Sequence, residues 1–113
     1  MERNFAIIPG NSGIVENPDG IVIILKADGE PEDLTGSNFV FRAVNGGVEL
    51  IRKDTDSGVV IDALAGKVTI PITVAESRSL PQICRYEIEQ RLGAAQRTRL
   101  RGQLVTVGGV NDD

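Results

Sequence analysis

The sequence predicts an all-β fold in which two sheets pack together as a sandwich. Segments of strand length recur at intervals of roughly 8–12 residues with turn residues between them, which is typical of sandwiches. Among the 113 residues are three Phe, one Tyr and no Trp, so the core consists mainly of Val, Ile and Leu, and β-branched residues favour strands. At the end of the stretch Leu80–Glu89, from Cys84 onward, apolar and charged side chains alternate as they do on a half-buried strand.

The first half of the chain supplies the candidate strands 5–8, 21–27, 38–45, 48–52 and 59–61. Loops rich in Gly, Pro, Asn and Asp separate most of these segments. Gly46 and Gly47 indicate a tight hairpin between the third and fourth strands. Phe39 and Phe41 are expected to point inward, because the chain has few other large side chains to fill a core.

The second half supplies the candidate strands 68–72, 83–91 and 96–107. Thr73 and Glu76 have the spacing of a capping box, which predicts one short helical turn near residues 74–80, closed by Pro81. The final strand is expected to direct one set of side chains outward, namely Arg97, Arg99 and Arg101. The set expected to face inward is Thr98, Leu100, Gly102 and Leu104.

The predicted core consists of large apolar side chains that alternate with polar neighbours. It comprises Phe39, Phe41, Val68, Ile70, Tyr86, Ile88 and Leu100. The length suits one domain with one modest core. We expect residues 1–19 to form an N-terminal arm or an edge strand, residues 20–107 the sandwich, and residues 108–113 a polar tail.

The composition disfavours several classes of function. A net charge of −4 argues against a nucleic-acid partner. The chain has no His, the commonest general base and metal ligand, and its single Cys84 permits neither an intrachain disulfide nor a thiolate metal cage. We therefore expect no enzyme and no cofactor, and Cys84 is interpreted as a small buried hydrophobe rather than a nucleophile.

Nothing in the sequence predicts a membrane or secretory segment. The longest apolar run, Ile21–Leu25, is far too short to span a bilayer. The N-terminus lacks a basic region followed by an apolar run, so no signal peptide is expected. These observations predict a protein made in the cytoplasm of its host cell.

Two loops invite a comparison with calcium sites. Asp33 lies near Glu30 and Glu32, and carboxylates suit Ca²⁺, but an Asp/Thr-stabilised turn with Leu34 tucked under the sheet is the favoured interpretation. The polar segment 53–58 lacks the Glu that closes a calcium loop. It is therefore interpreted as a solvated loop.

The candidate partner contacts are Phe5, Ile7, Ile8, Arg97, Arg99 and Arg101. The apolar segment 5–8 is expected either to add to its own sheet or to pair with a neighbour's sheet. The arginines form a predicted basic stripe with three interpretations: pairing with Glu87 and Glu89 on the adjacent strand, a protein contact, or a nucleic-acid surface. The last is weakest, because no aromatic platform accompanies the stripe.

The distribution of charge also suggests self-association. Residues 1–40 contain seven acidic and two basic residues, a net charge of −5, whereas residues 85–101 contain five Arg and two Glu, a net charge of +3. Such a chain is suited to head-to-tail packing of identical copies, which can close into rings. Light scattering at low and high salt tests this hypothesis, and a monomer under both conditions would count against it.

The order of motifs between residues 20 and 107 resembles a known pattern. The motifs are Ile21–Lys26, Asp33-Leu34-Thr35-Gly36, Asn38–Val44, Gly66-Lys67-Val68, Thr73–Ser79, Leu80-Pro81, Tyr86-Glu87-Ile88-Glu89 and Gly102-Gln103-Leu104-Val105-Thr106-Val107. This order resembles small phage and prophage virion proteins with an immunoglobulin-like sandwich, and the N-terminal domain of phage baseplate upper proteins. Two departures are the absence of the Gly that often follows Leu-Pro, where Gln82 and Ile83 stand, and Cys84 in place of an aromatic residue.

The resemblance implies an immunoglobulin-like antiparallel β-sandwich of about 7–8 strands. It further implies a structural component of a virion, in the tail, baseplate, neck or capsid, with other virion proteins and further copies of the chain as partners and no active site. An adhesion module that binds carbohydrate or a receptor is the alternative. An enzyme is the third and weakest hypothesis.

Overall fold

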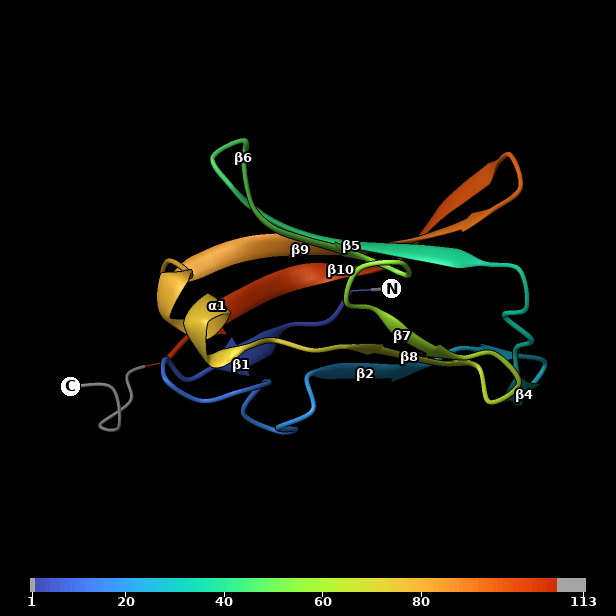
Figure 1. The fold of residues 1–113 in the computed structure, drawn as a ribbon, viewed down its shortest axis with the longest axis horizontal. Coiled ribbons are helices and arrows are strands. Elements are labelled where there is room, and N and C mark those ends of the chain that lie inside the picture. Colours follow the sequence, from blue (N-terminus) through green and yellow to red (C-terminus); the bar gives the residue numbers. More distant parts are fainter. Residues whose placement is uncertain (1, 108–113) are drawn as a thin grey trace.

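The structure is a computed structural model that describes residues 2–107, and the tail expected at 108–113 lies outside them. Within this range the chain is mostly β, as predicted, with one short helix (Figure 1). The elements are β1 (Phe5–Ile7), β2 (Ile21–Ile24), β3 (Lys26–Ala27), β4 (Glu30–Pro31), β5 (Asn38–Asn45), β6 (Val48–Asp54), β7 (Val60–Asp62), β8 (Lys67–Ile70), α1 (Val74–Ser79), β9 (Ile83–Leu92) and β10 (Ala95–Thr106).

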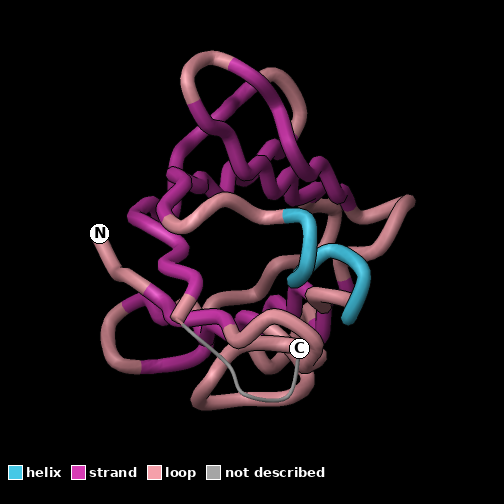
Figure 2. The backbone as a smooth tube through the Cα atoms, turned by 90° about the vertical axis from the view of Figure 1, so that its left-hand side faces the viewer, coloured by secondary structure: helices cyan, strands magenta, loops and turns pink. Residues whose placement is uncertain are grey.

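The strands form two layers. A five-stranded sheet, here called the large sheet, has the order β1-β10-β9-β5-β6, and a three-stranded sheet, the small sheet, has the order β2-β8-β7. Strands β3 and β4 form a separate two-stranded hairpin. Figure 1 shows the two sheets one above the other, and Figure 2, which looks along the long axis, shows α1 at one side of the layers.

The core lies between the layers and takes side chains from both. All seven residues assigned to the core by sequence pattern are at most 2% exposed. The ring of Tyr86 lies at its centre, with centroid distances of 5.7 Å to Phe5 and 6.0 Å to Phe41. Alternation along β5 and β9 thus directs one face of the large sheet into the core and the other outward, where every side chain of these two strands except that of Val40 is at least partly exposed.

The N-terminal strand β1 adds to the chain's own large sheet, where it is the edge strand beside β10. Phe5 and Ile7 are buried, so in this structure they are core residues and not the partner contacts suggested by the sequence. Ile8 is half-buried. The pairing of β1 with β10 is parallel, with Phe5 opposite Leu104, whereas the sequence predicted a purely antiparallel sandwich. A parallel pair is possible here because nearly the whole chain connects the two strands.

The predicted strand 21–27 divides into β2 and β3, because Leu25 leaves the small sheet and its N–H donates to the carbonyl of Gly66. The chain then turns through Asp28 and Gly29, which both have positive φ, and returns as β4. The sequence predicted a turn over 27–31, but not the two short strands that pair across it. The sequence signal of this hairpin is the Asp-Gly pair, which favours a two-residue hairpin turn.

The helix α1 begins as predicted. Thr73 is the N-cap: its Oγ1 accepts from the Glu76 N–H at 3.1 Å, and Glu76 Oε1 accepts from the Thr73 N–H at 2.9 Å. These reciprocal bonds form the capping box. The helix ends before Pro81, which cannot donate a backbone hydrogen bond.

Lys53 corrects the interpretation of 53–58 as a solvated loop. Lys53 belongs to β6, and only 9% of its surface is exposed. Its ammonium group points into the protein. Nζ donates to the carbonyl of Pro71 and, at 2.7 Å, to Oε1 of Glu76. The pairing supplies the hydrogen bonds that make burial of the charge tolerable.

Candidate protein-interaction surface

The outward face of the large sheet is cupped. The β5–β6 hairpin and the β9–β10 hairpin both rise away from the small sheet, one at each end of the face (Figure 1). We call the sheet surface between them the cupped face. It carries the side chains of Arg42, Val44, Glu49, Arg52, Arg85, Glu87, Glu89, Arg101 and Gln103. The face is therefore rich in charge of both signs.

Charged residues lie opposite one another across the strands of this face. Glu87 on β9 faces Arg101 on β10 and Arg42 on β5, and Arg42 in turn faces Arg52 on β6. Opposite charges on neighbouring strands stabilise a sheet modestly, whereas the directly opposed Arg42 and Arg52 are unfavourable unless an anion lies between them. Glu49 supplies that anion, since its Oε1 lies 3.9 Å from Arg42 Nε and 4.0 Å from Arg52 Nε.

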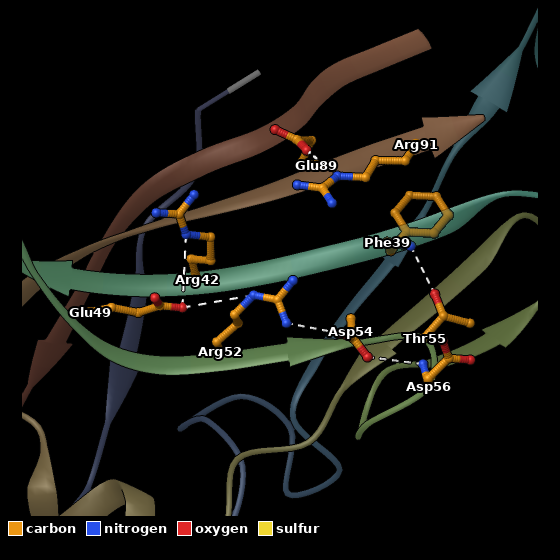
Figure 3. Close-up of polar contacts among 9 residues, drawn as sticks. All are labelled: Phe39, Arg42, Glu49, Arg52, Asp54, Thr55, Asp56, Glu89 and Arg91. Carbon is orange, nitrogen blue, oxygen red and sulfur yellow. Dashed lines mark hydrogen bonds and ion pairs between the residues drawn. The ribbon is translucent and has the colours of Figure 1, made fainter. Parts of the chain in front are cut away.

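Figure 3 shows how this cluster continues along the sheet. Arg52 also pairs with Asp54 at 2.9 Å, and Arg91 pairs with Glu89 at 2.7 Å. The arginine side chains remain 41–47% exposed in these pairs. Exposed ion pairs add little to stability, typically about 0–1 kcal/mol. The cluster therefore contributes little to holding the fold together.

A shallow depression of about 480 Å³ lies in the cupped face. Its walls carry Arg42, Arg85 and Arg101 together with Glu2 and Glu87, three cations against two anions. Arg85 and Arg101 make no side-chain hydrogen bond or ion pair with the part of the chain that the structure describes. Guanidinium groups of this kind bind carboxylates through paired hydrogen bonds, so acidic side chains of a protein partner fit this surface.

The depression is lined mainly by charged and polar side chains. Its lining contains no Ser, Cys or Lys. The Tyr86 hydroxyl donates to the carbonyl of Arg3, and burial raises the pKa of Tyr86 far above its ordinary value of 10.0. The phenol therefore keeps its proton and holds the N-terminal segment.

The predicted arginine stripe is broken by a β-bulge between Thr98 and Leu100. Arg97 lies opposite the buried Gln90, whereas Arg101 lies opposite the outward Glu87, so the two point to different faces. Thr98, expected inside, is exposed because the bulge changes the alternation. Arg97 and Arg101 are exposed and remain available to a partner.

Arg99, the extra residue of the bulge, is a structural residue and not a partner contact. Its guanidinium forms a two-pronged pair with Glu32, at 3.0 and 2.8 Å, and its side chain is only 11% exposed. The hydrogen bonds from Arg99 hold the pKa of Glu32 below its usual value of 4.5. This pair attaches the residues that follow β4 to β10.

The acidic N-terminal third does not form one separate patch. Glu16 pairs with Arg3 at 3.5 Å, Glu32 pairs with Arg99, and Glu2 bridges to the backbone of Arg101. Two of the seven acidic side chains, Glu16 and Glu32, are therefore already paired with arginines of the same chain.

The loop at Asp33 is a turn held by its own side chains. The N–H and Oγ1 of Thr35 both donate to Asp33 Oδ1, at 2.9 and 2.6 Å, and Leu34 is buried. These bonds lower the pKa of Asp33. Within residues 2–107, no three Cys, Asp or Glu side chains gather as a metal site would require. The geometry is that of the favoured turn interpretation.

Cys84 lies on the core face of β9 and is 2% exposed. Burial raises the pKa of its thiol above the ordinary value of 9.0. A buried protonated thiol is a poor nucleophile. Its position is that of the small hydrophobe expected from the sequence.

One edge of the large sheet is open at β6. Val48 and Leu50 on this strand are 61% and 37% exposed. A bulge separates the pairs Ala43–Ile51 and Val44–Glu49, which makes Leu50 the extra residue. The sequence analysis did not identify this surface. The sequence feature that accompanies this surface is a pair of apolar residues beside a Gly-Gly turn. That feature does not show which strand lies at the edge of a sheet.

No protein-family model matches this sequence, and no curated protein sequence matches it significantly. Among the described residues, the helix is too short and too polar to cross a membrane.

Proposed function

We propose that this chain is a non-enzymatic structural component of a phage virion, in the tail, baseplate, neck or capsid, and that it acts through protein–protein contacts. Its partners are other virion proteins and further copies of itself. In this proposal its fold is an immunoglobulin-like sandwich. The virion is where the protein functions after synthesis in the host cytoplasm.

The observation that carries the proposal is the order of elements between residues 20 and 107. Strand β5 follows the Asp33–Gly36 turn, helix α1 begins at Thr73, Leu80-Pro81 ends it, and β9 carries Tyr86 into the core. This order resembles the pattern of immunoglobulin-like virion proteins described above. Both the two-layer arrangement and the short capped helix are consistent with it.

The surface supports a role in assembly. The cupped face presents exposed arginines and glutamates between two raised hairpins, and β6 offers an open strand edge. Charge patterns of this kind orient a protein partner and fix its register. Open edges add the backbone hydrogen bonds that join one sheet to another.

The alternative, an adhesion module for carbohydrate, has weaker support. Sugar sites usually present exposed aromatic rings. The aromatic residues of this chain are three Phe and one Tyr, and all four are buried. Glycan-array binding by the isolated protein would favour the alternative.

Purified phage particles from the encoding strain test the proposal. We expect mass spectrometry to detect the chain in particles banded on a density gradient, at a constant ratio to the major tail or capsid protein. A soluble host enzyme of similar abundance serves as the control for carry-over. A chain that stays in the soluble fraction during particle production would contradict the proposal.

A further inference from the structure

Strand β6 is the open long edge of the large sheet. It is last in the strand order, and within residues 2–107 its one strand neighbour is β5, with an isolated bridge from Asp54 to Gly58 besides. The opposite edge is partly covered, because the Val15 N–H donates to the carbonyl of Ala6 on β1 at 2.8 Å. A row of unpaired backbone N–H and C=O groups makes an edge strand ready to pair with another chain.

The two halves of the β6 edge differ in how they are protected: Lys53 and Asp54 protect one, and the other has only the bulge at Leu50. Lys53 points its charge inward, and Asp54 is held in a turn in which its carbonyl accepts from the N–H groups of Ser57 and Val59. Inward-pointing charges and local turns are devices that block edge-to-edge pairing. The half formed by Val48–Arg52 has neither device, and it exposes two apolar side chains.

The bulge at Leu50 determines which side chains share a face. Because Val44 lies opposite Glu49 and Arg42 lies opposite Arg52, Glu49 and Arg52 both point to the cupped face. Without the bulge, two residues three apart on a strand would point to opposite faces. The open half of the edge therefore carries one anion and one cation on the same side.

We propose that two copies of this chain pair antiparallel through their β6 edges around a two-fold axis. In this register Glu49 of each copy lies opposite Arg52 of the other, and Leu50 lies opposite Ile51. The two large sheets join into one continuous sheet. This inference rests on the β6 edge alone and holds whether or not the chain belongs to a virion.

The proposed register follows from complementarity. It places residues of the same face opposite each other and forms the Glu49–Arg52 pair twice, as a two-fold interface requires. Sliding one strand by one residue sets outward side chains opposite inward ones. Sliding it by two residues in one direction sets Glu49 opposite Asp54, a pair of like charges, and in the other direction it sets Glu49 opposite Leu50, so the Glu49–Arg52 pair is lost either way.

Sedimentation of the full chain tests the proposal. Between about 1 µM and about 1 mM, we expect a concentration-dependent shift from the chain mass of 12.1 kDa to twice that value. Glu49→Arg places two Arg–Arg contacts in the interface, and Arg52→Glu places two Glu–Glu contacts there. Each variant is expected to dimerise about tenfold to a hundredfold more weakly than the wild type.

An equimolar mixture of the two variants gives the most specific result. In the mixed dimer, the arginine introduced at position 49 of one chain faces the glutamate introduced at position 52 of the other. The second contact joins the native Arg52 of the first chain to the native Glu49 of the second, so both contacts are attractive. We expect the mixture to dimerise like the wild type although neither variant does so alone. Merely unfolded or unstable variants would not produce this rescue.

Lys26→Glu and Glu30→Arg on the exposed β3–β4 hairpin are matched charge controls, and both should leave dimerisation unchanged. Circular dichroism and thermal unfolding verify the fold of every variant. A wild type that stays monomeric up to about 1 mM, or a mixture no better than its components, overturns the proposal. A monomeric chain detected in purified particles would overturn the dimer while leaving the virion role intact.

Discussion

Lys53 shows how one side chain can protect an edge strand and also hold the layers together. It lies on β6, yet its ammonium group reaches the carbonyl of Pro71 after β8 and the carboxylate of Glu76 in α1. The same Glu76 oxygen accepts from the Thr73 N–H at the start of the helix. Loss of Lys53 therefore affects three elements together.

We predict that Lys53→Ala lowers the free energy of unfolding by about 2–4 kcal/mol, because it leaves the Glu76 carboxylate and the Pro71 carbonyl without their donor. Urea denaturation at pH 7 measures the change. Lys67→Ala, on the exposed face of β8, is the control and should shift stability by about 0.5 kcal/mol or less. Equal effects of the two substitutions would contradict the role of Lys53.

Two glutamates should make stability depend on pH. Hydrogen bonds from Arg99 hold the pKa of Glu32 below its ordinary value of 4.5. Burial alone would raise the pKa of Glu76, but hydrogen bonds from Lys53 and Thr73 outweigh it and lower that pKa too. The folded state thus favours both carboxylates in their ionised form.

For a carboxylate with a lowered pKa in the folded state, the stabilisation is complete above the unfolded pKa and is lost as the pH falls through the folded pKa. We therefore predict that the free energy of unfolding is nearly constant above about pH 5.5 and decreases steeply below pH 4.5. Urea titrations from pH 7 to pH 3 check this prediction. The variants Glu32→Gln and Glu76→Gln should each be less stable than the wild type at pH 7, and their free energy of unfolding should decrease less as the pH falls. A wild-type free energy of unfolding that increases in acid would be inconsistent with the prediction.

At the scale of elements, β1 depends on a close approach to β10. The Arg3 N–H donates to the carbonyl of Arg101 at 2.9 Å, and the Tyr86 hydroxyl donates to the carbonyl of Arg3. This approach requires Gly102, because a Cβ at that position would lie 1.9 Å from the Arg3 oxygen. The obstacle is backbone, so a side chain cannot rotate out of the way.

We predict that Gly102→Ala displaces β1 and lowers the free energy of unfolding by about 1–3 kcal/mol. Amide hydrogen exchange should accelerate at Phe5 and Ile7 and stay slow in β5 and β9. Thr98→Ala, at an exposed position of the same strand, is the control. If exchange accelerates evenly across the large sheet, the effect of Gly102 is not specific to β1.

Sequence pattern located those elements whose signals are local. Alternation placed Phe41 and Tyr86 inside, and the spacing of Thr73 and Glu76 located the start of α1. Arg99 was misplaced because a bulge changes the alternation, and the bulge depends on contact with Glu32, which is 67 residues away. A period-two pattern carries no information about such a distant partner.

The candidate surfaces were only partly predictable for the same reason. Arg101 was identified as an exposed charge, but the partnership of Glu49 with both Arg42 and Arg52 depends on how β5 and β6 pair. The open edge at β6 depends on the order of all five strands in the large sheet. Strand order is set by packing of the whole chain, and no local sequence pattern indicates it.

At the scale of the whole molecule, one core joins the two ends of the chain. Phe5 from the first strand and Leu104 from the last strand both belong to the buried cluster that also contains Ile21 and Ile70 of the small sheet. Unfolding should therefore be a single cooperative transition, as it is for most small domains with one core. The parallel pairing of β1 with β10 nevertheless connects residues at the greatest separation in the fold.

This separation predicts the order of folding events. Sheets in which strands distant in sequence pair with each other fold slowly. Closing a loop of about 100 residues costs conformational entropy before the contacts between the two strands can form. We predict that β1 docks after the rate-limiting step, so Gly102→Ala should accelerate unfolding and barely change the folding rate. Phe41→Leu, at the centre of the β5–β9 pairing, should instead slow folding. Stopped-flow chevron plots in urea measure the folding and unfolding rates of both variants. A Gly102→Ala variant that folds as slowly as Phe41→Leu would instead place β1 in the folding nucleus.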